Sequence, residues 1–372
     1  MYDGLTNAID QSYSSSLTTV EAHWSGFYDY ESTIARYTIT VYHQPDGTIA
    51  ANPIYSTMVD GTVNQISLTQ FSFMNGDQIF VEVEASNGAG LMGTVRSNGY
   101  TIDLTPPQVM YIVDGTDPSD DLEHQSSNTT YVASWDITDD ESGIAGIEGA
   151  IFQIREGRRM KVYPPSPLQP FVSISTSQSV WSVSDDLTLD AGAKYVASIA
   201  FENGAGIRVV YETNGVIVDP TPPIVQTVSV ATDTYLSDDY AGALVTVLSD
   251  PQSIQAHWVA FDPESDIHGY QVGIFDDNDT LVFGYVSFEN TNGGVLEGAS
   301  PVLDSEKEYR VAVITINNAQ VQSFPAYSNR FRQVQYICSD INFSVSSTMA
   351  VCLAVSNVLS MHSSCICNYN RL

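Results

Sequence analysis

One sequence pattern occurs three times along the 372 residues, at spacings of about 110–120 positions. Its first element is a tryptophan followed by an acidic turn that ends in serine. The three copies are Trp24 with DYES at 29–32, Trp135 with DDES at 139–142, and Trp258 with DPES at 262–265. Repetition over such a distance is typical of separately folded units of one kind. The pattern therefore predicts three homologous domains in tandem.

A second element is an alternating run that leads, after eight positions, to an asparagine turn. It reads IFVEV then NGAG from 79 and 87, YVASI then NGAG from 195 and 203, and YRVAV then NNA from 309 and 317. Alternation with β-branched and aromatic residues predicts antiparallel strands, and no stretch has a convincing helical period.

A third element, DLTPP at 103–107 and DPTPP at 219–223, closes the first two copies. Two successive prolines cannot lie in a paired central strand, so each is expected at a domain junction. We therefore expect domains at 1–104, with a truncated first strand, at 105–220 and at 221–333. Residues 334–372 carry all four cysteines and little charge, and we expect a poorly ordered tail there.

The order of these elements resembles the fibronectin type III pattern over about residues 10–331. The resemblance implies an all-β fold of three tandem antiparallel β-sandwiches in an elongated array, with an irregular C-terminal tail. It places the tryptophans on strand B, Tyr37, Ile147 and Tyr270 on strand C, and a tyrosine-corner residue on strand F. The expected core residues are Trp24, Trp135, Trp258, Tyr37, Tyr270, Tyr195 and Tyr309.

The chain is strongly acidic, with 44 acidic and 13 basic residues and a formal net charge of −31. Nucleic-acid partners are excluded because neutralising phosphates requires clustered Lys and Arg. No serine-hydrolase elbow and no phosphate loop leading into a helix occurs, so we expect neither enzymatic activity nor an organic cofactor.

The acidic turns have two readings. In the first, their Asp and Ser side chains simply bond backbone N–H groups of the turn. In the second, the linker aspartate of one domain approaches the acidic and asparagine turns of the next, and the oxygens bind Ca²⁺. The candidate ligands are Asp103, Asp139, Glu141 and Asn203 at one junction, and Asp219, Asp262, Glu264 and Asn317 at the other.

These observations favour a non-enzymatic extracellular or cell-surface array that presents loops to a protein or glycan partner. Two alternatives stay open: a calcium-rigidified, cadherin-like adhesion module, and spacer domains of a larger secreted enzyme. Sequons at Asn128, Asn278 and Asn342 are compatible with glycosylation. The first residues lack a signal-peptide pattern, and we expect that signal upstream of a truncated start. The tail is too interrupted by polar residues to favour a membrane anchor.

Overall fold

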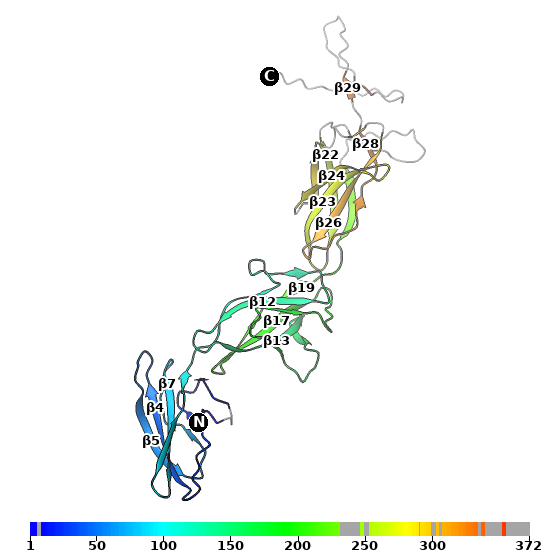
Figure 1. Ribbon diagram of the computed structural model, residues 1–372. Coiled ribbons are helices and arrows are strands. Elements are labelled where there is room, and N and C mark those ends of the chain that lie inside the picture. The colour runs from blue at the N-terminus through cyan, green and yellow to red at the C-terminus, as the bar shows by residue number, and fades with distance from the viewer. Residues whose placement is uncertain are drawn as a thin grey trace, which may run out of the picture. The chain divides into compact units, whose positions relative to one another are not determined.

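The computed structural model describes residues 1–5, 9–230, 246–248, 253–289, 291–298, 303–304, 307–333, 336–338 and 352–354. All regular structure in these residues is β-strand, as predicted (Figure 1). None of the described segments forms a helix long and apolar enough to cross a membrane.

The first repeat consists of two sheets. One sheet has the order β1 (Tyr2–Asp3), β3 (Val20–His23), β6 (Gln65–Leu68). The other has the order β2 (Tyr13–Ser14), β9 (Tyr100–Ile102), β7 (Gln78–Asn87), β4 (Ile34–Gln44), β5 (Asn52–Asp60), and β8 (Met92–Arg96) also pairs with β7. Strands β4, β5 and β7 lie side by side in Figure 1.

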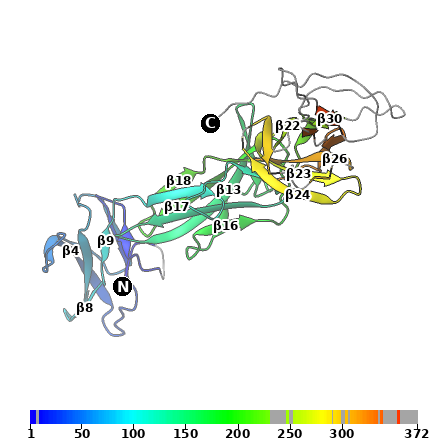
Figure 2. The same ribbon diagram turned by 90° about the horizontal axis from the view of Figure 1, so that it is seen from above.

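The second repeat has the same plan. Its smaller sheet has the order β10 (Gln108–Asp114), β12 (Tyr131–Thr138), β16 (Val180–Val183). Its larger sheet has the order β11 (His124–Gln125), β19 (Val216–Val218), β17 (Lys194–Asn203), β13 (Ile144–Arg155), β14 (Arg158–Tyr163), with β15 (Val172–Ile174) on β13 and β18 (Arg208–Glu212) on β17. Figure 2 shows β13, β17 and β18 running together.

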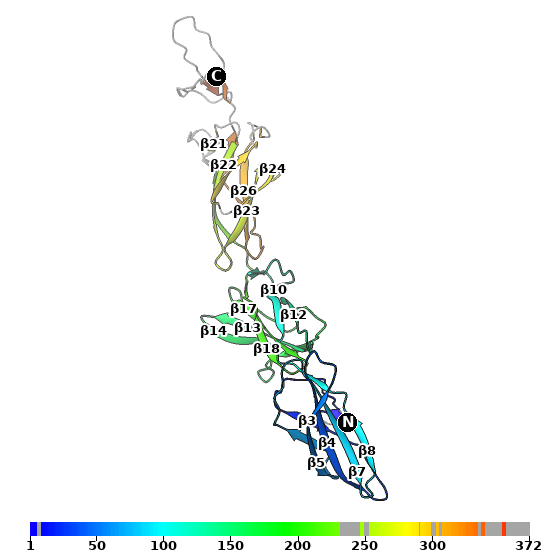
Figure 3. The ribbon, with the colours of Figure 1, turned by 90° about the vertical axis from the view of Figure 1, so that its left-hand side faces the viewer.

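The third repeat follows the plan again. Its smaller sheet has the order β20 (Ile224–Val230), β22 (Ser253–Phe261), β25 (Gly293–Glu297). Its larger sheet has the order β21 (Thr246–Leu248), β28 (Phe331–Gln333), β26 (Tyr309–Asn317), β23 (Ile267–Asp276), β24 (Leu281–Phe288), with β27 (Ala326–Tyr327) on β26. Strands β23, β24 and β26 are labelled in Figure 3.

One pair in each larger sheet is parallel, although antiparallel pairing was expected throughout. These pairs are β2 with β9, β11 with β19, and β21 with β28. The short parallel strand therefore places the start of each repeat beside its own last strand.

Contacts between residues divide the chain into two compact units. The first comprises Met1–Glu123, Thr129–Leu189 and Ala193–Val216; the second comprises His124–Asn128, Asp190–Gly192 and Ile217–Leu372. The expected boundaries near residues 104 and 220 fall between strands, after β9 and after β19. Of the expected tail, strands β29 (Tyr336–Cys338) and β30 (Cys352–Ala354) are described as an antiparallel pair, and its other residues lie outside the described part of the chain.

A tryptophan lies in the interior of each repeat, and Trp24, Trp135 and Trp258 are each at most 2% exposed. In the first and third repeats a strand tyrosine packs against it: the ring centroids of Trp24 and Tyr37 are 5.5 Å apart, and those of Trp258 and Tyr270 are 5.3 Å apart. Burial of such large rings between two sheets is the main stabilising contribution in a domain without disulfides.

In the second repeat the corresponding strand position carries Ile147, which lacks a ring. Phe201, on the neighbouring strand β17, packs edge-on against Trp135 with a centroid separation of 5.8 Å. The aromatic pair is thus kept, but its second member comes from a different strand. An interior of nearly constant volume can be filled from either strand because both face the same tryptophan.

Candidate functional site at the repeat junctions

Asp103, which ends the first repeat, is hydrogen-bonded both to that repeat and to the linker that follows it. Its backbone N–H donates to Ser14 O at 3.0 Å, which continues the parallel pairing of β2 with β9. Its side chain turns toward the next repeat: Oδ1 accepts bonds from the N–H and hydroxyl of Thr105, at 2.9 and 2.8 Å. This Asx turn folds the segment that leads to the two prolines. Asp103 therefore lies both at the end of one ladder and at the start of the junction.

The turn between β12 and β13 is held by Asp139. Its Oδ1 accepts bonds from the backbone N–H groups of Ser142 and Gly143, at 2.9 and 3.0 Å. The Ser142 hydroxyl lies 3.3 Å from Asp139 Oδ1 of the same turn and donates to Asp103 Oδ2 at the shorter distance of 2.5 Å. The short Asp-x-x-Ser spacing thus closes its own turn and supplies a donor to the incoming chain.

The turn between β17 and β18 contributes Asn203, which contacts both Asp103 and Asp139. Asn203 Oδ1 accepts bonds from the N–H groups of Ala205 and Ile207, at 3.1 and 2.8 Å, which fixes the orientation of the amide. Its Nδ2 must then point the other way. It donates to Asp103 Oδ2 at 2.9 Å, to Thr105 O at 2.9 Å and to Asp139 Oδ2 at 3.1 Å. One amide group therefore joins both turns to the linker.

The second junction has the same arrangement, formed by residues of the same types at equivalent positions. Asp219 N–H donates to Gln125 O at 2.8 Å, and Asp219 Oδ2 accepts from Ser265 Oγ at 2.5 Å and from Asn317 Nδ2 at 2.7 Å. The same Nδ2 donates to Asp262 Oδ2 at 3.1 Å. We call each set the polar clasp: Asp103, Asp139, Ser142 and Asn203 at the first junction, and Asp219, Asp262, Ser265 and Asn317 at the second.

In the described residues no Lys, Arg or His is a hydrogen-bond partner of the linker carboxylates Asp103 and Asp219. Asp103 and Asp219 are both 0% exposed. Burial raises the pKa of the Asp219 carboxyl, but hydrogen bonds from Ser265 and Thr221 outweigh it, and the pKa lies below its ordinary value of 3.8. A buried carboxylate costs several kcal/mol unless donors surround it, and the clasp provides those donors.

The predicted calcium ligands are brought together unevenly. At the second junction, side-chain oxygens of Asp219, Asp262 and Glu264 lie within 4.8 Å of one another; this is the one such acidic group found in the described residues. At the first junction Asp103 and Asp139 share the Asn203 amide, while Glu141 is exposed.

The donor chemistry fits calcium poorly. Calcium takes six to eight oxygen ligands, whereas a nitrogen donor, the amide of Asn203 or Asn317, lies between the two aspartates at each junction. Both carboxylate oxygens of Asp103 and of Asp219 already accept hydrogen bonds. The calcium hypothesis stays a prediction.

The first repeat has turn residues equivalent to those of the clasp, namely Asp29, Ser32 and Asn87. In the described residues no linker aspartate is hydrogen-bonded to them. Asp29 Oδ1 accepts from Ser32 N and Ser32 Oγ at 2.6 and 3.1 Å, and Asp29 Oδ2 accepts from Asn87 Nδ2 at 3.0 Å. Asn87 Oδ1 accepts from the N–H groups of Ala89 and Leu91, as Asn203 Oδ1 does from Ala205 and Ile207 in the second repeat. The Ser32 N–H and the Asn87 amide hold the pKa of Asp29 at about 2.

A second kind of buried carboxylate was not anticipated from the sequence. Asp114 is 1% exposed; its oxygens accept bonds from the Tyr131 hydroxyl and, at 2.8 Å, from Gly215 N. Asp3 is 0% exposed and accepts from Gly99 N at 3.1 Å. Burial raises the pKa of both carboxyls to about 6. The available signal was an Asp-Gly pair at matching places, before Gly4 and before Gly115.

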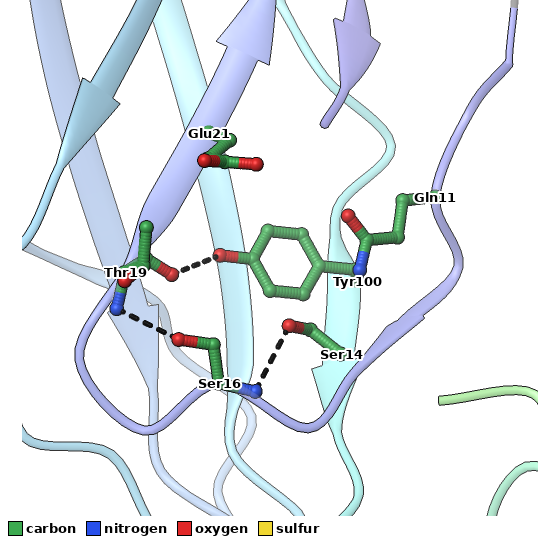
Figure 4. Close-up of a pocket in the computed structure, with 6 residues that line it drawn as sticks. All are labelled: Gln11, Ser14, Ser16, Thr19, Glu21 and Tyr100. Carbon is green, nitrogen blue, oxygen red and sulfur yellow. Dashed lines mark hydrogen bonds between the residues drawn. The ribbon is translucent and has the colours of Figure 1, made fainter. Parts of the chain in front are cut away.

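A polar hollow of about 230 Å³ lies in the first repeat beside β3 and β9 (Figure 4). Its side chains mostly bond to the loop itself: the Tyr100 hydroxyl donates to Thr19 O at 3.5 Å, and Ser14 Oγ accepts from Ser16 N at 3.2 Å. The remaining lining residues are Gln11 and Glu21. The hydroxyls of Tyr100 and Ser14 therefore bond to backbone groups of the loop at 14–19 and stabilise it.

Two of the predicted glycosylation sequons lie in described loops. Asn128 and Asn278 are exposed, and Asn278 lies in the turn between β23 and β24. Asn342 lies outside the described residues. Accessibility is what a glycan requires, so modification of the first two stays a prediction.

No protein-family model matches the chain, and no curated protein matches it. Similar solved structures include the FN1–FN3 domains of chicken CNTN1, at 13% identity over 89% of this chain and 96% of that one, with a TM-score of 0.31.

Two further structures are similar to a comparable degree. One is from a 1.5-MDa bacterial ice-binding adhesin, at 15% identity over 85% of this chain and 90% of that one, TM-score 0.33. The other comprises the fibronectin(III)-like modules of Clostridium thermocellum CbhA, at 12% identity over 61% and 95%, TM-score 0.32. The fold assignment itself depends on the strand order within each repeat. In each repeat a three-stranded sheet faces a larger sheet. In the larger sheet the strand that comes first in the chain pairs in parallel with the strand that comes last. Each repeat is a fibronectin type III-like sandwich.

In two of these fibronectin type III-like repeats a tyrosine occupies the predicted corner position, near the start of β17 in the second repeat and of β26 in the third. Tyr309 is 2% exposed and its hydroxyl accepts from Asp304 N, five residues upstream, at 2.7 Å. Tyr195 is 1% exposed and its hydroxyl accepts from Gln153 Nε2 at 2.9 Å. The buried ring thus keeps its polar tip bonded, by a different partner in each repeat.

Proposed function

We propose that the chain is a non-enzymatic structural or adhesion array of an extracellular or cell-surface protein, in which the polar clasp holds each junction. The observation that carries this proposal is the double role of Asp103 and Asp219. The backbone of each is bonded to the repeat that ends, and its buried side chain is bonded to the turns of the repeat that begins. A junction made in this way leaves no free residue before the two prolines.

The mechanism is mechanical. Proline-rich linkers are semi-rigid, and a buried carboxylate that loses its donors on bending is costly. The array would therefore resist bending at its junctions and keep its exposed loops at fixed spacing for a protein or glycan partner. The exposed sequons at Asn128 and Asn278 support placement outside the cell, because glycans are added to surface loops of secreted chains.

Small-angle X-ray scattering of the full chain tests this function. The double variant Asp103→Asn with Asp219→Asn should scatter as a more flexible chain, with a raised plateau in the dimensionless Kratky plot. The matched control is Asp140→Asn with Asp277→Asn, which removes two exposed carboxylates instead. Identical curves for wild type and the junction variant would rule out clasp-held junctions.

Calcium is the second candidate for what stiffens the array, favoured by the proximity of Asp219, Asp262 and Glu264. If calcium binds there, a chelator should lower the unfolding temperature of wild type and added calcium should restore it. If the clasp acts alone, neither treatment changes the unfolding temperature. The variant Glu264→Gln separates the two, because Glu264 is a candidate ligand but not a member of the clasp.

A further inference from the structure

All four cysteines of the chain follow the third repeat, and two of them occupy facing positions in one strand pair. Strands β29 and β30 are antiparallel, and β29 is labelled in Figure 1. Their register is Tyr336↔Ala354, Ile337↔Leu353 and Cys338↔Cys352. Cys365 and Cys367 lie outside the described residues. The ladder therefore singles out one particular pair of cysteines.

Facing positions of an antiparallel ladder suit a disulfide. Their Cα atoms are about 4.5 Å apart in a non-hydrogen-bonded pair and about 5.5 Å apart in a hydrogen-bonded pair. Both separations fall within the range of about 4.4–6.8 Å that a disulfide spans. Facing residues also lie on the same face of the two strands. The register of Cys338 and Cys352 thus meets the backbone requirement for a cross-link.

The strand pair is small for an element of its own. It has two strands of three residues each, and no third strand pairs with them in the described part of the chain. A two-stranded ribbon alone is marginally stable in water, because few backbone hydrogen bonds oppose the entropy of the chain. A covalent link between facing residues reduces the entropy of the unpaired state. The pairing and the cross-link therefore stabilise each other.

We propose that Cys338 and Cys352 form a disulfide that closes the segment 338–352 after the third repeat. Both S–H bonds break and one S–S bond forms. The two protons pass to solvent, and the two electrons pass to a disulfide oxidant such as oxidised glutathione, which becomes two thiols. The inference goes beyond the proposed function and does not depend on the clasp, and an extracellular location would keep the bond oxidised.

The sequence offers a comparison between two loops of nearly equal length. Cys352 is 14 positions from Cys338 and 13 positions from Cys365. The entropic cost of closing a loop changes slowly with its length, so an unstructured chain would form the two disulfides in nearly equal amounts. The ladder favours only the first disulfide. One net hydrogen bond of the ladder corresponds to roughly a threefold to tenfold preference.

The full chain with Cys367→Ser tests this competition. The protein is equilibrated with reduced and oxidised glutathione, free thiols are blocked, and chymotryptic fragments are identified by mass spectrometry without reduction. Cleavage after Phe343 and Leu359 separates the three remaining cysteines into different fragments. The disulfide that joins β29 to β30 should exceed the Cys352–Cys365 disulfide at least about threefold.

A pair of double variants tests whether the ladder causes the preference. Successive N–H groups of a strand alternate in facing its partner, so Leu353→Pro with Ala354→Pro removes at least one ladder position, and the ratio should fall to about one. The matched control, Leu353→Val with Ala354→Val, keeps residues that favour strands and should keep the preference.

Equal amounts of the two disulfides in the Cys367→Ser chain would overturn the proposal, and so would a ratio that the two prolines leave unchanged. Failure of the junction mechanism would appear separately, as unchanged scattering of the Asp103 and Asp219 variants.

Discussion

Asn203 Nδ2 lies 2.9 Å from Asp103 Oδ2, although the two residues are 100 positions apart in the chain. The asparagine ends a strand of the second repeat, and the aspartate directly follows the last strand of the first. Both side chains use one atom for their own turn and another for the contact between them. The bond therefore depends on two correctly folded turns at once, and the junction forms only when the second repeat is folded.

The clasp makes the linker aspartates important for stability. Asp103→Asn removes the charge and one acceptor, which leaves donors of Ser142 and Asn203 poorly paired, and it should lower the free energy of unfolding of the second repeat by about 2 kcal/mol. Denaturant unfolding followed by tryptophan fluorescence measures this. Asp140→Asn, which changes an exposed residue of the same turn, should stay within about 0.5 kcal/mol of wild type. Equal effects of the two variants would contradict a role for the buried carboxylate.

The buried Asp114 predicts a loss of stability as the pH rises. Burial raises its folded pKa from 3.8 to about 6, despite hydrogen bonds from Tyr131, Thr213 and Gly215. A raised pKa of an acid means that the folded state binds the proton more tightly. The contribution of protonated Asp114 to the free energy of unfolding is therefore complete below about pH 3.8, and it is lost as the pH rises through about 6.

Between about pH 5 and about pH 7.5 this one group should lower the free energy of unfolding by about 1.4 kcal/mol. Asp3 acts in the same direction, since its pKa is also raised to about 6. Carboxyls with lowered pKa, such as Asp29 and Asp219, lose their contribution only in more acidic solution, so they do not interfere in this window. Calorimetry at both pH values should show a smaller difference in the free energy of unfolding for Asp114→Asn than for wild type. An unchanged difference would exclude Asp114 as its source.

Gly215 is expected to tolerate no side chain. Its φ is +93°, and a Cβ would lie 2.7 Å from Tyr195 O and 2.6 Å from a Val196 methyl carbon. Gly215→Ala should therefore destabilise the second repeat by about 3 kcal/mol, from the strained dihedral together with the backbone clash. Gly157→Ala is the control, because Gly157 has a φ of +73° but no atom within 4 Å of the added carbon. It should cost about 1 kcal/mol, and a similar loss at both sites would show that the clash contributes nothing.

Much of the fold could be predicted from the sequence because the relevant signals are local and repeated. The alternating runs before Asn87, Asn203 and Asn317 predicted strands, and the paired prolines after Thr105 and Thr221 predicted breaks between repeats. The approach of the linker aspartates to the acidic and asparagine turns was expected from the resemblance to fibronectin type III domains. The partner of Trp135 was not: Phe201 is distant in the sequence, and only the pairing of β13 with β17 places it beside the tryptophan.

The sequence by itself determined the all-β character, the threefold repetition and the residue types that gather at each junction, since periodicity and turn chemistry act over a few neighbouring positions. Only the tertiary structure decided how those groups are used. It placed an amide nitrogen between two carboxylates, where a cation had been considered, and it buried Asp3 and Asp114 away from solvent. Hydrogen-bond pairing and desolvation depend on distances between segments about a hundred residues apart, which no local pattern specifies.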